Sequence, residues 1–150
     1  MKALTLRHPW PFAICRMGKR FENRSWKPPQ GLIGHRIAIH GGKVPAANTE
    51  LREVMRCVQQ LTDKFGTPSG FQYVTANDVL ACSGIVAIAT LTGYLTITDD
   101  LWFDRTGYRW QLSDVAVLHT PVPCKGAQGL WKVPDDVLQV VNARLAYRGE

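Results

Sequence analysis

Helical and strand patterns follow one another in an irregular order along this sequence, and that order narrows the choice of folds. Strands are predicted over 3–6, 21–26, 36–40, 84–95, 108–118 and 127–133, and helices over 11–17, 49–64, 77–81 and 134–146. A doubly wound parallel sheet requires strands and helices in strict alternation, which this order lacks. We therefore expect an α+β fold, with helices packed around a compact mixed sheet or small barrel.

The helix over 49–64 has the clearest pattern. Its apolar residues recur at helical spacing, and they are Leu51, Val54, Met55, Val58 and Leu61. Asn48 or Thr49 is expected to cap its start, and Gly66 to end it.

Two predicted strands flank one polar stretch. Residues 84–95 are rich in β-branched side chains, as buried strands are. Residues 96–107 are polar and mixed, which predicts a long loop. A strand with a kink near Ser113 and Asp114 is expected to follow over 108–118.

The chain has the size of one domain, which we expect to span 1–150. A chain of 150 residues buries about 68–70% of its unfolded surface and needs no disulfide or metal to fold. No apolar run is long enough to cross a bilayer, and the first residues lack a secretory signal pattern. The four cysteines are isolated, which argues against a zinc site and favours reduced thiols. We expect a cytoplasmic protein without cofactor, metal or membrane partner.

Positive charge is concentrated at the start of the sequence. The first 43 residues hold nine Lys or Arg and one acid, Glu22, a balance of +8, whereas the other 107 residues hold nine cations and eleven acids, a balance of −2. Aromatic residues are interleaved with these cations, and they are Trp10, Phe12, Phe21 and Trp26. Aromatic faces stack on bases while cations contact phosphates, so the pattern indicates nucleic-acid binding. A solvated basic surface that attracts anions in general is the simpler alternative.

A cluster of functional groups is expected around Lys19. If 21–26 is extended, Glu22, Arg24 and Trp26 point to one face. Lys19, at the end of the preceding helix, reaches the same patch. Together these groups offer an anion anchor, an acceptor for a base amino group and a stacking surface.

Three segments carry a resemblance to a known family. They read Leu4-Thr5-Leu6-Arg7-His8-Pro9-Trp10, Lys19-x-x-Glu22-Asn23-Arg24-Ser25-Trp26 and Ile37-x-Ile39-His40-x-x-Lys43. In these segments the chain resembles the ASCH domain family, whose hallmark is G-x-K-x-x-E-x-R, and Lys19, Glu22 and Arg24 match its last three fixed positions. Later segments are similar to the C-terminal half of bacterial and phage members, and they read Trp110-x-Leu112-x-Asp114-Val115, Pro121-Val122-Pro123-Cys124-Lys125-Gly126 and Gly129-Leu130-Trp131.

The resemblance implies a PUA-like small mixed β-barrel with helices packed around it. It also implies RNA or nucleic-acid binding in a cleft beside the barrel, lined by the hallmark residues. Some members of the family are enzymes. One branch hydrolyses the acetyl amide of N4-acetylcytidine with a threonine that follows the motif lysine, that lysine and a later glutamate, and another branch is described as a metal-dependent ribonuclease.

The sequence departs from the hallmark at two positions. Met17 occupies the glycine position, with Gly18 one residue later, and Arg20 stands where many members have threonine. A guanidinium cannot act as an acyl nucleophile, so the threonine mechanism does not carry over. Lys19 stays a candidate for activating water, if neighbouring cations such as Arg24 lower its pKa.

A metal-dependent nuclease would need several convergent carboxylates. The basic segment offers only Glu22. Asp99, Asp100 and Asp104 cluster in the predicted loop, where adjacent acids are usually just solvated. We therefore expect no metal site.

The interpretation favoured by the sequence is a cleft that binds RNA, another single-stranded nucleic acid or a modified nucleoside. The expected contact residues are Arg7, Trp10, Lys19, Glu22, Arg24, Trp26, His40 and Lys43. Two alternatives stay open. One is a hydrolase acting on an acylated nucleoside or on RNA, with Lys19 and Glu22 as catalytic residues, and the other is a basic protein-interaction module. The simpler role for Glu22 is that of a structural partner of Arg24, and the simpler role for His40 is that of a histidine with satisfied hydrogen bonds.

Overall fold

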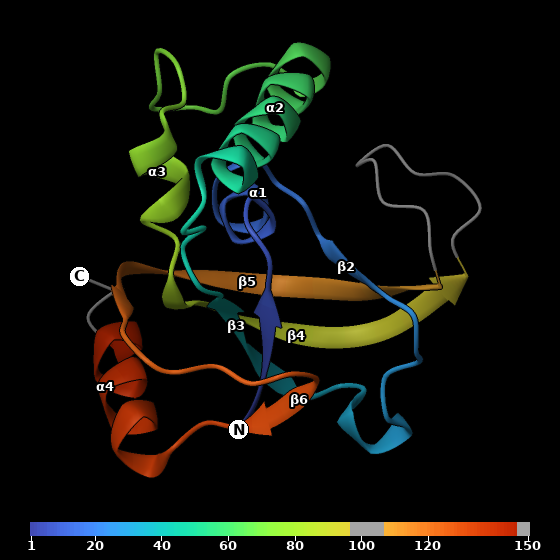
Figure 1. The fold of residues 1–150 in the computed structure, drawn as a ribbon. Coiled ribbons are helices and arrows are strands. Elements are labelled where there is room, and N and C mark those ends of the chain that lie inside the picture. The colour runs from blue at the N-terminus through green and yellow to red at the C-terminus, as the bar shows by residue number, and fades with distance from the viewer. Residues whose placement is uncertain (97–106, 147–150) are drawn as a thin grey trace.

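The computed structural model describes residues 1–96 and 107–146, and Figure 1 shows its elements. The strands are β1 (Lys2–Leu6), β2 (Phe21–Arg24), β3 (Arg36–Gly41), β4 (Gly84–Thr96), β5 (Tyr108–Val122) and β6 (Leu130–Lys132). The helices are α1 (Trp10–Arg16), α2 (Asn48–Phe65), α3 (Ala76–Leu80) and α4 (Asp135–Ala146), with one 3₁₀ turn over Gln30–Leu32.

All six strands belong to one curled sheet in the order β2-β5-β4-β3-β1-β6. β1 and β3 are parallel, and every other neighbouring pair is antiparallel. The α+β class is confirmed, but the sheet is a half-barrel that stays open along β2 and β6 (Figure 1). These edge strands have only four and three residues, and each pairs with a single neighbour, β2 with β5 and β6 with β1, so no ladder closes the sheet into a barrel.

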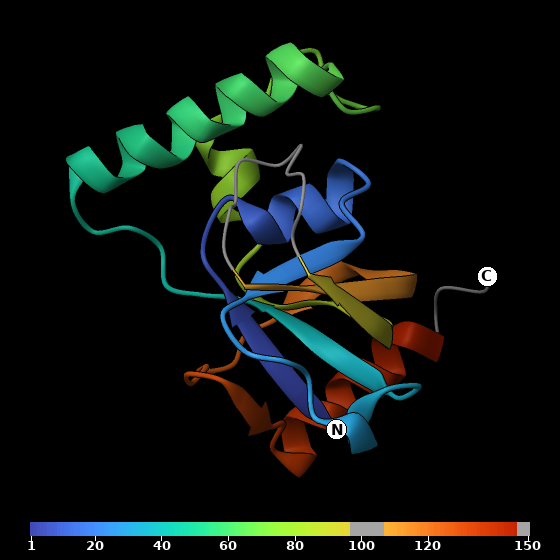
Figure 2. The ribbon, with the colours of Figure 1, turned by 90° about the vertical axis from the view of Figure 1, so that its right-hand side faces the viewer.

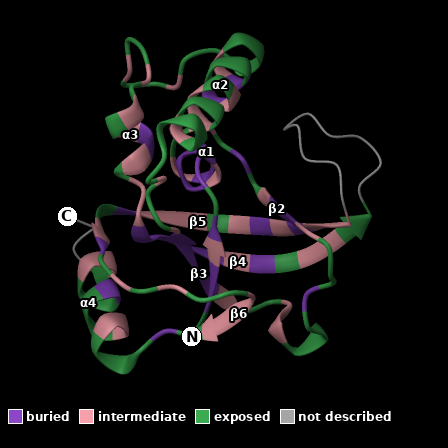
Figure 3. Cartoon of the chain, viewed as in Figure 1, coloured by how far each residue is buried: buried purple, intermediate pink, exposed green. Residues whose placement is uncertain are grey.

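Helices cover both faces of the sheet. Figure 2 shows α1 directly over the sheet with α2 above it, while α4 lies on the opposite side. Between α1 and the sheet lies a core cluster that includes Leu6, Ile14, Ile37, Ile39, Leu91 and Trp110. A second cluster under α4 includes Ala38, Ile88, Leu118 and Val141. The purple, buried segments in Figure 3 accordingly concentrate in the central strands.

α2 is attached to the rest of the molecule through one apolar stripe. Val58 packs with Phe12 of α1 and Val79 of α3, and Leu61 packs with Ala13. The remaining surface of the helix is largely exposed (Figure 3). The helix therefore stands as a second layer over α1 and depends on a few contacts for its position.

Several local predictions are confirmed and several need correction. The kink in β5 is present, because Asp114 has φ 48° and the register with β4 shifts nearby. No side chain caps α2, whose first residue follows Ala47, so the expected cap by Asn48 or Thr49 is wrong. β6 is shorter than predicted, since residues 127–129 belong to a loop. The loop predicted over 96–107 lies mostly outside the described residues.

No helix within 1–96 and 107–146 combines enough length and apolar character to span a membrane.

Candidate ligand-binding cleft

A cleft of about 1810 Å³ lies where β1 and β3 end. Because the two strands are parallel and Leu6 lies opposite Gly41, both carboxyl ends meet at the same edge of the sheet. The walls come from 5–10, 22–26, 40–46, the first turns of α2, residues 81–84, and the end of β5 with the loop over 123–129. The fold therefore brings the basic N-terminal segment and a C-terminal loop to the two sides of one cavity.

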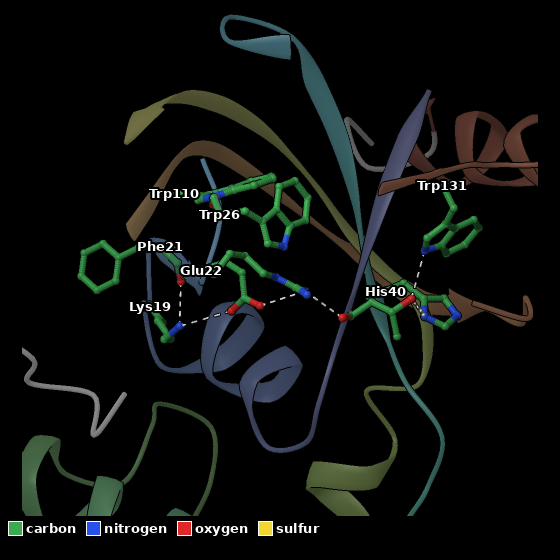
Figure 4. Close-up of polar contacts among 9 residues, drawn as sticks. Lys19, Phe21, Glu22, Trp26, His40, Trp110 and Trp131 are labelled. Carbon is green, nitrogen blue, oxygen red and sulfur yellow. Dashed lines mark hydrogen bonds and ion pairs between the residues drawn. The ribbon is translucent and has the colours of Figure 1, made fainter. Parts of the chain in front are cut away.

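One wall of the cleft is built on a buried ion cluster formed by Lys19, Glu22 and Arg24 (Figure 4). Glu22 Oε2 lies 3.0 Å from Arg24 Nη2, and Glu22 Oε1 lies 3.8 Å from Lys19 Nζ. Lys19 also donates to the Phe21 carbonyl at 2.7 Å. Lys19 is only 1% and Glu22 only 6% exposed, so water screens their charges little and the ion pairs contribute to compensating them.

Arg24 also connects two distant strands. Its Nη2 donates to the Thr5 carbonyl at 2.8 Å. Thr5 belongs to β1, and Arg24 is the last residue of β2. Three strands, β5, β4 and β3, separate β2 from β1 in the sheet. Since the two strands share no ladder bonds, this hydrogen bond spans the concave side of the half-barrel.

The opposite wall is organised by His40. Trp131 Nε1 donates to Thr5 Oγ1 at 3.0 Å, and Thr5 Oγ1 lies 3.1 Å from His40 Nδ1. His40 Nε2 lies 2.6 Å from the Cys124 carbonyl. A carbonyl only accepts, which assigns the imidazole proton to Nε2 and makes Nδ1 the acceptor of the Thr5 hydroxyl.

The loop over 123–129 approaches this wall through Gly126. A Cβ atom at Gly126 would lie 2.5 Å from Thr5 Oγ1 and 2.6 Å from His40 Cε1. No side chain fits that space, so glycine allows the loop backbone to lie directly over Thr5 and His40.

His8 is a second buried histidine in the cleft wall. It donates from Nε2 to the Gly42 carbonyl at 3.0 Å, and its buried Nδ1 has no hydrogen-bond partner in the structure. Burial lowers the pKa of His8, with nearby His40 lowering it further and the bond to Gly42 opposing the shift. Burial also lowers the pKa of His40, against the bond to Cys124. Both imidazoles are therefore held neutral in the folded protein.

The structure brings most of the predicted contact residues together. Those that line the cleft are Arg7, Trp10, Glu22, Arg24, Trp26, His40 and Lys43. Lys19 is not part of the lining, because its ammonium is turned toward Glu22 and lies 5.0 Å from the Trp10 ring centroid. Trp26 is 36% exposed and packs edge-to-face on Trp110 with ring centroids 4.7 Å apart.

Lys125, which is not among the contact residues predicted from the sequence, is exposed and lines the cleft beside Gly126. Its segment carries the family resemblance but no further signal of a contact role. No periodicity in the sequence indicates that this loop folds back over His40. That Lys125 lines the same cleft as the N-terminal cations therefore becomes apparent only from the three-dimensional structure.

Within 1–96 and 107–146, no group of three or more His, Cys, Asp or Glu side chains is arranged to hold a metal ion. Asp99, Asp100 and Asp104 lie outside the described residues.

The chain matches no protein-family model and no curated protein. Its function therefore has to be inferred from the chemistry of the cleft.

Glu22→Gln should destabilise the protein by about 3–5 kcal/mol, because the buried Lys19 and the partly buried Arg24 lose the carboxylate charge that faces both of them. Glu53→Gln is a matched control, since Glu53 pairs with Arg56 on the surface at 2.6 Å with side chains about two-thirds exposed. That control should cost no more than about 1 kcal/mol. Urea unfolding of both variants measures the difference. Equal losses would contradict the structural role of the buried cluster.

Stability should fall when the pH drops below the ordinary histidine pKa of 6.5. The unfolded chain then binds protons that the folded protein, with its lowered pKa values, does not bind. Stability is therefore full above 6.5 and is lost as the pH falls toward the folded-state pKa values. His40→Gln should reduce the slope of the free energy of unfolding against pH by up to about 1.4 kcal/mol per pH unit.

Urea unfolding between pH 7.5 and 5.5 measures this slope. His119→Gln is the control, because His119 is exposed, and its slope should match that of the wild type. The claim that His8 and His40 have lowered pKa values in the folded protein is wrong if replacing either of them leaves the slope unchanged.

Proposed function

We propose that this chain binds single-stranded RNA or a modified nucleotide in the cleft. The observation that carries the proposal is the convergence of four cations and two indoles in one cavity. They are Arg7, Arg24, Lys43, Lys125, Trp10 and Trp26. The proposal includes membership of the ASCH domain family and a PUA-like fold, which the hallmark residues and the curled half-barrel support.

The charge of the cleft favours a polyanion. Against its four cations stand two acids, Glu22 and Glu50. Glu22 is already engaged by Arg24 at 3.0 Å. Arg7, Lys43 and Lys125 are exposed, so they are accessible to phosphate oxygens. Phosphate contacts of this kind release counterions from a nucleic-acid strand and supply most of its non-specific affinity.

The other groups suit a nucleobase. The exposed part of the Trp26 ring offers a face for stacking, worth about 1–3 kcal/mol per base. The Glu22 carboxylate is fixed in the cleft wall by Arg24. A fixed acceptor of this kind pairs with the amino group on a base edge.

The geometry supports binding better than hydrolysis. Lys19 Nζ donates to the Phe21 carbonyl and lies beside Glu22, so it does not point into the cleft. Arg20, which stands where many family members have threonine, donates to the Ile14 and Lys19 carbonyls at 3.0 Å each. These contacts suit structural roles, in which Lys19 positions Glu22.

Replacing Arg7, Lys43 and Lys125 together by alanine should weaken binding of a short labelled oligoribonucleotide by about tenfold or more at low salt. The slope of log affinity against log salt should become less steep by about 2, since each lost phosphate contact removes about 0.7. Fluorescence anisotropy at several salt concentrations measures both values.

The charge-matched control replaces Lys2, Lys64 and Lys132, which are exposed and lie outside the cleft lining. Its affinity should stay close to that of the wild type. The proposal fails if the wild type does not bind at low salt, or if both triple variants lose affinity equally. Acetate released from N4-acetylcytidine by the wild type and not by Lys19→Ala would favour a hydrolase instead.

A further inference from the structure

A second aromatic and basic cluster lies at the far end of β4 and β5. The rings of Tyr94 and Tyr108 meet edge-to-face with centroids 5.8 Å apart. The ammonium of Lys27 lies 5.8 Å from the first centroid and 5.6 Å from the second. These three residues, here named the tyrosine platform, are not part of the cleft lining.

The platform shares a sheet face with the cleft wall. In the antiparallel pairs, Tyr94 lies opposite Trp110, and Tyr108 lies opposite Arg24. Residues directly opposite one another in a sheet project to the same face. The tyrosines therefore stand on the side of the sheet that carries Arg24.

Trp26 joins the platform to the cleft. Its ring packs on Trp110 at 4.7 Å and also lines the cleft. Trp110 is fully buried and donates from Nε1 to the Trp26 carbonyl at 2.9 Å, which fixes the backbone next to Lys27. Trp26 therefore packs on Trp110, the residue that lies opposite Tyr94 in the sheet.

The platform has a charge available for a ligand. Lys27 is exposed, and both tyrosines are partly exposed. Lys27 takes part in none of the ion pairs formed within 1–96 and 107–146. The two rings attract its ammonium by cation–π interaction, and its N–H groups can donate to a phosphate.

We infer that the tyrosine platform is a second nucleotide subsite. It would take a neighbouring nucleotide of the strand bound in the cleft, with the base stacked on a tyrosine ring and the phosphate contacting Lys27. This inference rests on the proposed function and narrows its ligand to an oligonucleotide rather than a free nucleoside.

Oligoadenylates of increasing length, from AMP to about six nucleotides, test the inference by calorimetry or by competition with a labelled strand. The wild type should gain roughly 5- to 150-fold in affinity once the strand is long enough to reach the platform, which is the range for one stacked base. Lys27→Ala and Tyr94→Ala should lose most of this gain and keep the wild-type affinity for AMP.

Matched variants separate stacking from general effects. Tyr94→Phe should keep the gain with length, because the ring face and not the hydroxyl carries the contact. Lys132→Ala removes an equal charge elsewhere, and Tyr73→Ala removes a tyrosine that is 69% exposed, so both should bind all lengths like the wild type. If thermal unfolding shows that Tyr94→Ala does not fold, Lys27→Ala at its exposed position decides the matter.

The outcomes distinguish the two proposals. A wild type that binds AMP but gains nothing with length overturns the second subsite and leaves the proposed function in place. The same conclusion follows if Lys27→Ala keeps the full gain. A wild type that binds neither AMP nor the longest strand at low salt overturns the proposed function, and the subsite with it.

Discussion

The pairing of one buried carboxylate with two cations is the constraint on which the cleft depends. Glu22 compensates Lys19 on one side and Arg24 on the other, and burial makes each of these charges costly without the others. Arg24 then uses its guanidinium to reach the Thr5 carbonyl across the concave side of the sheet. An open half-barrel lacks the closing ladder that would otherwise fix its curvature, so this side-chain bridge links strands that the backbone leaves unconnected.

Thr5 joins the two walls of the cleft. Its carbonyl receives the bridge from Arg24, and its hydroxyl connects Trp131 with His40. The basic N-terminal segment and the C-terminal loop are consequently positioned by contacts to the same residue. A cavity whose walls are fixed in this way is preorganised, so a ligand would not have to order it on binding.

Local patterns in the sequence identify most elements of this fold, because periodicity and turn residues determine them at short range. The shared face of Glu22 and Arg24 follows from strand alternation alone. The burial of Lys19 does not follow from the sequence. A lysine in a basic segment usually lies on the surface, and here its burial depends on how α1 and β2 pack. The joining role of Thr5 and the position of Lys125 depend on contacts between distant segments. For the same reason the open half-barrel was not distinguishable from a small barrel.

An NMR titration of ¹⁵N-labelled protein with a short oligoribonucleotide tests most directly whether the cleft binds nucleic acid, because it maps the contact without any substitution. The largest shifts are expected at the Trp26 indole N–H and at backbone amides of 41–46 and 123–129, which line the cleft, with α4 unchanged. Largest shifts on α4, or no shifts at low salt, would contradict it.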